Sequence, residues 1–200
     1  MPQQPDPIAA TRAWVDHAVI GLNLCPFAKA VQTKGQVRYV LSLARDESAL
    51  QAALVDELQA LAAADPALID TTLLVHPEVL QDFLDFNDFL GVAEATVEAM
   101  GLTGVIQIAS FHPQYQFAGN QADDITNHSN RSPHPTLHLL RESSIDAAVA
   151  AFPDAADIYE RNIDTLQRLG LEGWQRLMAV AHDAPASLGH APEQGKGPAQ

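Results

Sequence analysis

Short runs of alternating polarity are separated along this chain by longer segments whose apolar residues repeat at helical spacing. Residues 36–44 place apolar side chains at every second position, which is typical of a strand with one buried face. After Asp46, a residue type that caps helices, leucines recur at three- and four-residue intervals until Asp65. The apolar residues 71–75 then predict a second strand. A strand, a helix and another strand in succession indicate helices packed on a sheet.

The alternation continues and predicts about four strands in all. The remaining strands are expected at 105–109 and 136–140, and the remaining helices at 6–22, 26–33, 77–100, 143–152 and from 153 onward. We therefore expect an α/β fold, with α+β as the alternative. It would have a single sheet of about four strands, covered by helices in the manner of a split βαβ sandwich. One domain is expected over residues 6–180, and the Pro- and Gly-rich residues 184–200 are expected to form a disordered tail.

Acidic residues dominate the charged positions, because 25 Asp and Glu stand against 11 Lys and Arg, for a net charge of −14. Such a surface repels phosphate backbones and anionic lipid, so neither nucleic acid nor a membrane is expected as a partner. The chain has one cysteine, no secretory signal and no apolar run of about 18 residues, which together predict a cytoplasmic protein. The pattern does not determine the oligomeric state.

Histidines mark the expected strand ends. His76 follows the second strand and His112 the third, and each precedes a proline, which holds its backbone extended. Ligands bind at the carboxyl ends of strands in open α/β sheets. With His138 from the fourth strand, three imidazoles could converge there, either as ligands of one divalent transition metal ion or as acid/base groups. The alternative is that His76 and His112 are turn or cap residues and His138 is a hydrogen-bonded core residue.

Residues 113–135 form a long stretch without helical or strand periodicity, a length at which loops in compact domains are usually functional. Phe111, Tyr115 and Phe117 predict that it packs on the domain, where it could act as a lid. Polar side chains in and after it could hold a small, anionic substrate, namely Asn127, Asn130, Arg131 and Arg141. The alternative for the arginines is a salt bridge to the abundant acidic residues.

Cys25 is the single thiol of the chain, and Pro26 after it suits the first position of a helix. Cys25 would then be the cap, facing free backbone amides that stabilise a thiolate. A thiolate can act as a nucleophile or a redox centre, with a histidine such as His112 as its base. The alternative is that Cys25 is a small buried apolar residue.

Four blocks of the sequence carry a family resemblance: WVDHAVIGLNLCPFAKAV, LLVHPEVLQDFLDF, IQIASFHPQYQFAG and NRSPHPTLHLLRE. They resemble an uncharacterised bacterial family, domain of unknown function 1415, over nearly all of residues 12–170. The resemblance implies a small bacterial cytoplasmic protein. It implies no activity, cofactor or site residue.

Three functional hypotheses follow from the residues. The first is a small-molecule enzyme with His76, His112 and His138 at the strand ends. The second is an enzyme that uses Cys25 as nucleophile or redox thiol. The third is a non-catalytic protein that binds a partner through residues 113–135. Phosphate-binding, dinucleotide-binding, esterase and thioredoxin motifs are missing from the sequence, so none of these standard activities is expected.

Overall fold

A computed structural model describes residues 6–151 and 157–183. At its centre is an open four-stranded sheet in the order β1-β2-β4-β3. The strands are β1 (Val37–Leu41), β2 (Thr71–Val75), β3 (Ile106–Phe111) and β4 (Thr136–Arg141). β1 runs parallel to β2, and β4 runs antiparallel to both β2 and β3. The carboxyl ends of β1, β2 and β3 therefore share one edge of the sheet, where β4 begins.

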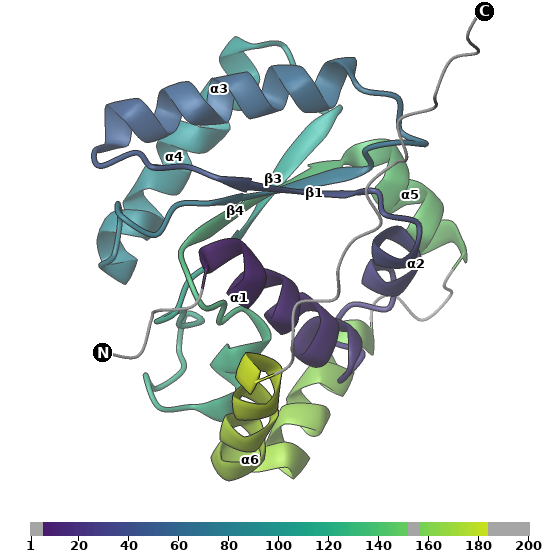
Figure 1. Cartoon of the computed structure of the whole chain (residues 1–200), viewed down its shortest axis with the longest axis vertical. Coiled ribbons are helices and arrows are strands. Elements are labelled where there is room, and N and C mark those ends of the chain that lie inside the picture. Colours follow the sequence, from purple (N-terminus) through teal and green to yellow (C-terminus); the bar gives the residue numbers. More distant parts are fainter. Residues whose placement is uncertain (1–5, 152–156, 184–200) are drawn as a thin grey trace, which may run out of the picture.

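Helices cover both faces of the sheet (Figure 1). One face carries α3 (Glu47–Ala63) and α4 (Phe83–Ala99), and the other carries α1 (Pro7–Trp14), a π-helix (Val15–Ile20) and α6 (Ile158–Asp183). The remaining helical segments are α2 (Ala28–Thr33), a 3-10 helix (Ile125–Ser129) and α5 (Glu142–Ala151). The crossovers β1-α3-β2 and β2-α4-β3 place both helices on one face, because they step across the sheet in the same direction with the same hand. Since β4 lies between β2 and β3, the second crossover is a split βαβ unit, which confirms the predicted fold class.

Aspartate side chains begin three of the helices. Asp46 caps α3, as the sequence predicts, and Asp6 caps α1. Asp82 caps α4 by accepting hydrogen bonds from the backbone N–H groups of Leu84 and Asp85. The prediction that this last helix begins at Pro77 is wrong by six residues, because the capping carboxylate stands at Asp82. Residues 77–82 form a turn-rich connection instead, and Leu84 at the start of α4 is 70% exposed.

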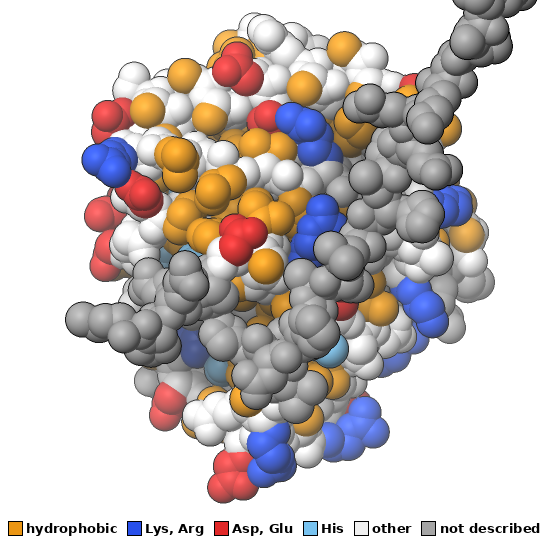
Figure 2. Space-filling view, in the orientation of Figure 1, with side chains coloured by type: hydrophobic (Ala, Val, Ile, Leu, Met, Phe, Trp, Pro, Cys, Tyr) orange, Lys and Arg blue, Asp and Glu red, His pale blue; other side chains and the backbone are white. Residues whose placement is uncertain are grey.

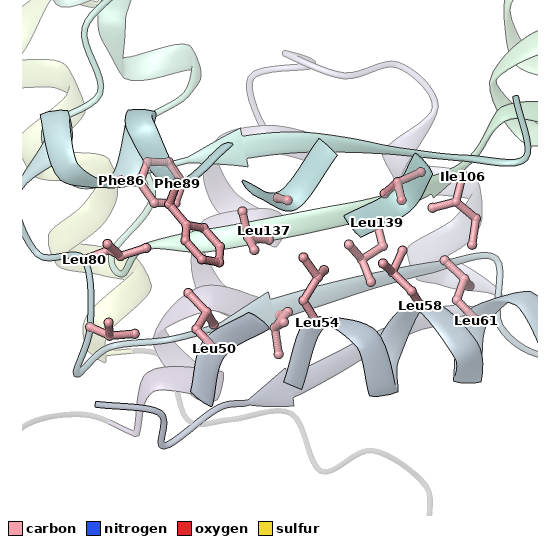
Figure 3. Packing of buried hydrophobic residues seen from close by; sticks show 14 residues of the cluster. Leu50, Leu54, Leu58, Leu61, Leu80, Phe86, Phe89, Ile106, Leu137 and Leu139 are labelled. Carbon is pink, nitrogen blue, oxygen red and sulfur yellow. The ribbon is translucent and has the colours of Figure 1, made fainter. Parts of the chain in front are cut away.

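Two apolar clusters hold the helices to the sheet. On the α3/α4 face, the α3 leucines lie in a row facing Leu137 and Leu139, with Phe86 and Phe89 of α4 above them (Figure 3). On the other face, Trp14 and Ala18 pack with Leu73, Leu166 and Trp174. Burial of each leucine or phenylalanine contributes roughly 1.5–3 kcal/mol, so these clusters fix the strand ends that carry the histidines. The expected helix start at 153 and the expected disordered tail at 184–200 lie outside the described residues.

Leu54 is fully buried at the centre of the α3 row, so its truncation measures how far this face depends on packing. We expect Leu54→Ala to lower the free energy of unfolding by about 2–5 kcal/mol, since it removes apolar contacts and leaves a cavity. Urea unfolding followed by circular dichroism measures the change. Leu68→Ala is the matched control, because Leu68 is 70% exposed and its loss is expected to cost less than about 0.5 kcal/mol. Equal effects of the two substitutions would contradict the core described here.

Candidate functional site at the carboxyl edge of the sheet

His76 and His112 come together at the carboxyl ends of β2 and β3. Both side chains are fully buried, and both rings lie against Phe86 of α4, with ring-centroid distances of 5.8 Å for His76 and 5.1 Å for His112. The start of β4 passes between them, because the N–H of His76 donates to the carbonyl of Pro135. The sequence prediction that these two histidines share one site is consistent with this arrangement.

The hydrogen bonds of His112 determine its tautomer. Its Nδ1 accepts a hydrogen bond from the backbone N–H of Gln114 at 3.0 Å, so Nδ1 carries no proton. The proton then lies on Nε2, which is 3.2 Å from the carbonyl oxygen of Leu80 and donates to it. Both ring nitrogens of His112 are therefore occupied by the backbone.

His76 differs because only one of its nitrogens has a partner. Its Nδ1 lies 3.2 Å from the carbonyl oxygen of Val79, and since a carbonyl only accepts, Nδ1 carries the proton. Nε2 is therefore an unprotonated nitrogen with a free lone pair, and it is buried without a hydrogen-bond partner among the described residues. A buried polar atom without a partner costs about 1–3 kcal/mol, so its presence requires an explanation.

Burial keeps both imidazoles neutral. Loss of hydration lowers the pKa of His76 to about 4, with the bond to Val79 opposing the shift and the neighbouring His112 adding to it. Loss of hydration also lowers the pKa of His112, and the bond to Leu80 and the nearby Asp82 carboxylate oppose that shift. At neutral pH both rings are therefore uncharged.

A hollow of about 770 Å³ lies on the outer side of the segment that the two histidines hold. Val79 and Leu80 form one wall, and the first turns of α3 and α4 form the others. Its charged lining residues are Arg45, Asp46, Glu47, Asp82 and Asp85. Ligand sites commonly have volumes of this order, and an acidic lining of this kind favours a neutral or positively charged molecule.

Leu80 adopts a backbone conformation that is costly for its residue type. Its φ angle is +56°, in the left-handed region, where an L-residue with a Cβ pays roughly 1–2 kcal/mol. The carbonyl of Leu80 accepts the hydrogen bond from His112, and the preceding carbonyl accepts from His76. The two histidines therefore hold the strained wall of the hollow in place.

His138 does not join this site. It is paired with Leu73 and Ala109 in the sheet, and its ring contacts Phe111 on the α1/α6 face, whereas Leu137 and Leu139 belong to the α3/α4 cluster. Its Nε2 lies 2.7 Å from Thr71 Oγ1, whose own proton goes to the carbonyl of Leu139. Loss of hydration lowers the pKa of His138 to about 4. This matches the alternative reading of a hydrogen-bonded structural histidine.

The arrangement does not support the expected metal centre. A transition metal in a protein takes three or more side-chain ligands within about 2.3 Å. Among residues 6–151 and 157–183, no group of three or more His, Cys, Asp or Glu side chains is placed to hold an ion. His76 and His112 face one side of the sheet and His138 the other, so the three predicted ligands cannot share one ion in this arrangement.

Arg141 is expected to bind an anion, but its side chain instead caps the C-terminal end of helix α3. Its guanidinium is buried and its Nη2 donates to the carbonyl oxygens of Leu61, Ala64 and Ile69, at 2.6 to 3.3 Å. The last carbonyls of a helix have no partner within the helix, and Arg141 supplies one from β4. These partners are all backbone carbonyls, and no carboxylate of the described residues pairs with Arg141.

The other three expected substrate-binding residues hold the 113–135 loop together. Asn127 is fully buried, where its Oδ1 accepts from the Phe117 N–H and its Nδ2 donates to the Gln121 carbonyl. Arg131 donates from Nε to the Tyr115 carbonyl at 3.0 Å, and Asn130 donates to the carbonyl of Ser110 on β3. The loop packs on the domain, as its aromatic residues predict. Its anchoring polar groups bind the backbone of the loop itself and of β3, which argues against a freely opening lid.

Cys25 also lies in a different position from the helix cap that the sequence predicts. Helix α2 begins at Ala28, and the residue before it is Phe27, whose side chain makes no capping hydrogen bond. Cys25 lies in the bend before this helix, where its carbonyl accepts from the Ala28 N–H, and its side chain is partly exposed. Because Pro26 does not begin the helix, the prediction that Cys25 is a helix cap is wrong.

The segment Val79–Leu80 is the part of the site that sequence reasoning missed. The sequence predicts a helix that begins at Pro77, and this prediction places both residues inside regular structure. The aspartate at position 82, followed by Asp85, carried the correct signal, since an Asp cap with an acidic residue in the first turn is typical of a helix start.

Comparison with known proteins identifies a family and nothing beyond it. A family model described as "Protein of unknown function (DUF1415)" matches residues 6–176. Neither a curated protein nor a solved structure matches the chain significantly. In the described part of the chain, every helix is too short or too polar to cross a bilayer.

The neutral state of His76 predicts a pH dependence of stability. Its pKa is about 4 in the folded chain and about 6.5 when solvated, so the unfolded chain binds a proton in a range where the folded chain does not. The stabilisation is fully present above pH 6.5 and is lost as pH falls through about 4. We expect the contribution of His76 alone to lower the free energy of unfolding by about 2 kcal/mol between pH 7.5 and pH 5. Urea unfolding at both pH values, compared with His76→Asn, isolates this term. An equal loss in the variant would contradict it.

The hydrogen bonds of Arg141 predict that its substitution destabilises the fold but leaves the secondary structure in place. Arg141→Met keeps the length of the side chain and leaves buried carbonyls of α3 without a donor, so we expect the free energy of unfolding to fall by about 2–4 kcal/mol. Arg176→Met is the matched control, because Arg176 is exposed and its pair with Glu172 is worth at most about 0.5 kcal/mol. If both variants unfold at the same urea concentration, Arg141 does not stabilise the end of α3.

Proposed function

We propose a function for a chain that belongs to the DUF1415 family of proteins of unknown function: it binds a small molecule in the hollow at the carboxyl ends of β1 and β2, and uses His76 to accept a proton from it. The observation that carries the proposal is the unpartnered Nε2 of His76. At this edge it is the imidazole nitrogen that the backbone leaves free, since both nitrogens of His112 are bonded.

The chemistry of His76 suits a general base. A bond from Nδ1–H to a backbone carbonyl sets the tautomer and leaves Nε2 to act on a ligand, which is the arrangement of catalytic histidines in general. The low pKa of the enclosed ring makes it a weak base while water is excluded. Burial is the largest cause of the shift, so movement of the Val79–Leu80 wall would rehydrate the ring and return its basicity towards neutral pH.

Movement of this wall is supported by the strain at Leu80. A residue that leaves the left-handed region regains the energy it costs, which offsets part of the loss of the His112 hydrogen bond. The wall separates the hollow from the two rings, since Val79 and Leu80 line the hollow and also bond the histidines. A ligand that displaces the wall would open a path to the His76 ring.

The charge of the hollow indicates the class of ligand. Four carboxylates line it against one arginine, and Arg45 is paired with Glu78 at 2.8 Å. A neutral polar molecule or an amine fits this lining better than the anionic substrate that the arginines of the sequence suggested. The single cysteine and the acidic surface fit a bacterial cytoplasm as the location of this activity.

Reaction with diethyl pyrocarbonate, which acylates unprotonated imidazole nitrogens, tests whether Nε2 becomes accessible. We expect His76 in the native protein to react far faster than the chain unfolds in the same buffer, because the wall opens locally. Peptide mapping by mass spectrometry gives the rate at His76, and urea-jump kinetics give the unfolding rate. A molecule that fills the hollow and displaces the wall, but does not bind Nε2, should change the rate of acylation at His76.

His76→Asn is the matched variant, because the Asn side chain retains an N–H donor near the position of Nδ1 and lacks Nε2. It is expected to remain folded and to lose proton transfer, whereas ligand binding in the hollow persists. Acylation of His76 only at the rate of global unfolding would mean that His76 is a permanently enclosed core residue, and the proposal would then be abandoned.

A further inference from the structure

The outer edge of β1 presents backbone groups that the sheet does not use. In the parallel pairing with β2, the N–H of Ser42 donates to the carbonyl of Val75, so even-numbered residues of β1 bond to β2. The N–H and C=O groups of Val37, Tyr39 and Leu41 therefore point away from the sheet. Within the described residues, no backbone hydrogen bond is formed by these outward groups. β1 is an edge strand without a proline or a bulge to interrupt a further pairing.

Apolar side chains accompany this edge. Leu41 is 36% exposed and Leu43 is 66% exposed, and hydrophobic side chains gather in the space-filling view where β1 crosses the front of the molecule (Figure 2). The side chain of Arg38, which could guard the edge, is bound to Glu57 of α3 by two hydrogen bonds, at 2.9 and 3.1 Å. The edge therefore combines free backbone groups with exposed apolar surface.

Two cations without a carboxylate partner lie beside this edge, although the protein as a whole is acidic. The first 45 residues contain five of the 11 Lys and Arg residues and only two of the 25 Asp and Glu residues. The Arg12 guanidinium lies 4.1 Å from the centre of the Tyr39 ring, on β1 itself, and Lys34 lies just before the strand. Neither Arg12 nor Lys34 has a carboxylate partner among the described residues.

We propose that the outer edge of β1 binds an extended acidic segment of another protein, which adds to the sheet as a fifth strand. Main-chain hydrogen bonds would supply the affinity, with alternate apolar side chains on Leu41 and Leu43 and carboxylates near Arg12 and Lys34 supplying the selectivity. A second copy of this chain fits less well, since pairing two β1 edges would bring the same cations together. Residues 184–200 also fit less well, because they hold one carboxylate side chain and three prolines.

A capped peptide of alternating valine and glutamate, carrying a fluorescent label, is the probe for this proposal. Fluorescence anisotropy with the full chain is expected to show binding that weakens as salt is added. The matched peptide with lysine in place of glutamate is expected to bind at least about tenfold more weakly. Because N–H groups alternate between the two edges of a strand, N-methylation of one alternate set should abolish binding and methylation of the other should leave it intact.

Variants of the protein locate the site. Leu41→Glu and Arg12→Glu are each expected to weaken binding of the acidic peptide about tenfold, whereas Leu68→Glu, a change at an exposed leucine elsewhere, should not. The proposal is overturned by equal binding of both peptides, by indifference to N-methylation, or by no binding up to about 1 mM. It is also overturned if sedimentation shows a dimer that Leu41→Glu dissociates, or if binding appears only after removal of residues 184–200.

Discussion

The insertion of β4 between two parallel strands is the constraint on which the rest of this structure depends. β4 pairs antiparallel with both β2 and β3, so it holds the strand ends that carry His76 and His112 at one edge of the sheet. Just before the start of this strand, the carbonyl of Pro135 accepts a hydrogen bond from the N–H of His76. At its other end it carries Arg141, whose side chain donates hydrogen bonds to the last carbonyls of α3. One strand thus positions the candidate site and completes the helix that covers it.

Backbone carbonyls, rather than ligands, account for most of the polar side chains that stand out in this acidic chain. A helix end and a long loop each leave carbonyl oxygens without partners, and burying them without donors costs about as much as a lost hydrogen bond. Arg141 donates hydrogen bonds to these carbonyls at the end of α3, and Arg131 and Asn127 donate them within the loop. Scarcity of cations in a sequence is therefore compatible with entirely structural roles for those present.

In the described part of the chain, His76 Nε2 is one of three buried side-chain polar atoms without a hydrogen-bond partner, the others being Trp14 Nε1 and Thr72 Oγ1. The structure supplies donors and acceptors for Arg141, Asn127 and both nitrogens of His112, but leaves one nitrogen of His76 enclosed and free. Next to it, Leu80 holds a left-handed conformation. An unpaired buried nitrogen and a strained residue in the same segment both reduce the stability of the fold. Unfavourable features of this kind are often found at functional sites.

The strand positions, the α3 cap and the fold class were predictable from the sequence because periodicity and capping depend on neighbouring residues. The location of His76 and His112 at one edge of the sheet followed from the general rule that ligand sites lie at the carboxyl ends of strands in open α/β sheets. Tertiary structure alone decided the strand order, the partners of Arg141 and the exclusion of His138 from the site. β2 is buried on both faces, so its residues show no alternation that would reveal which side His76 occupies. The face of the sheet on which each histidine lies is set by pairing between strands far apart in the chain, and local sequence carries no record of it.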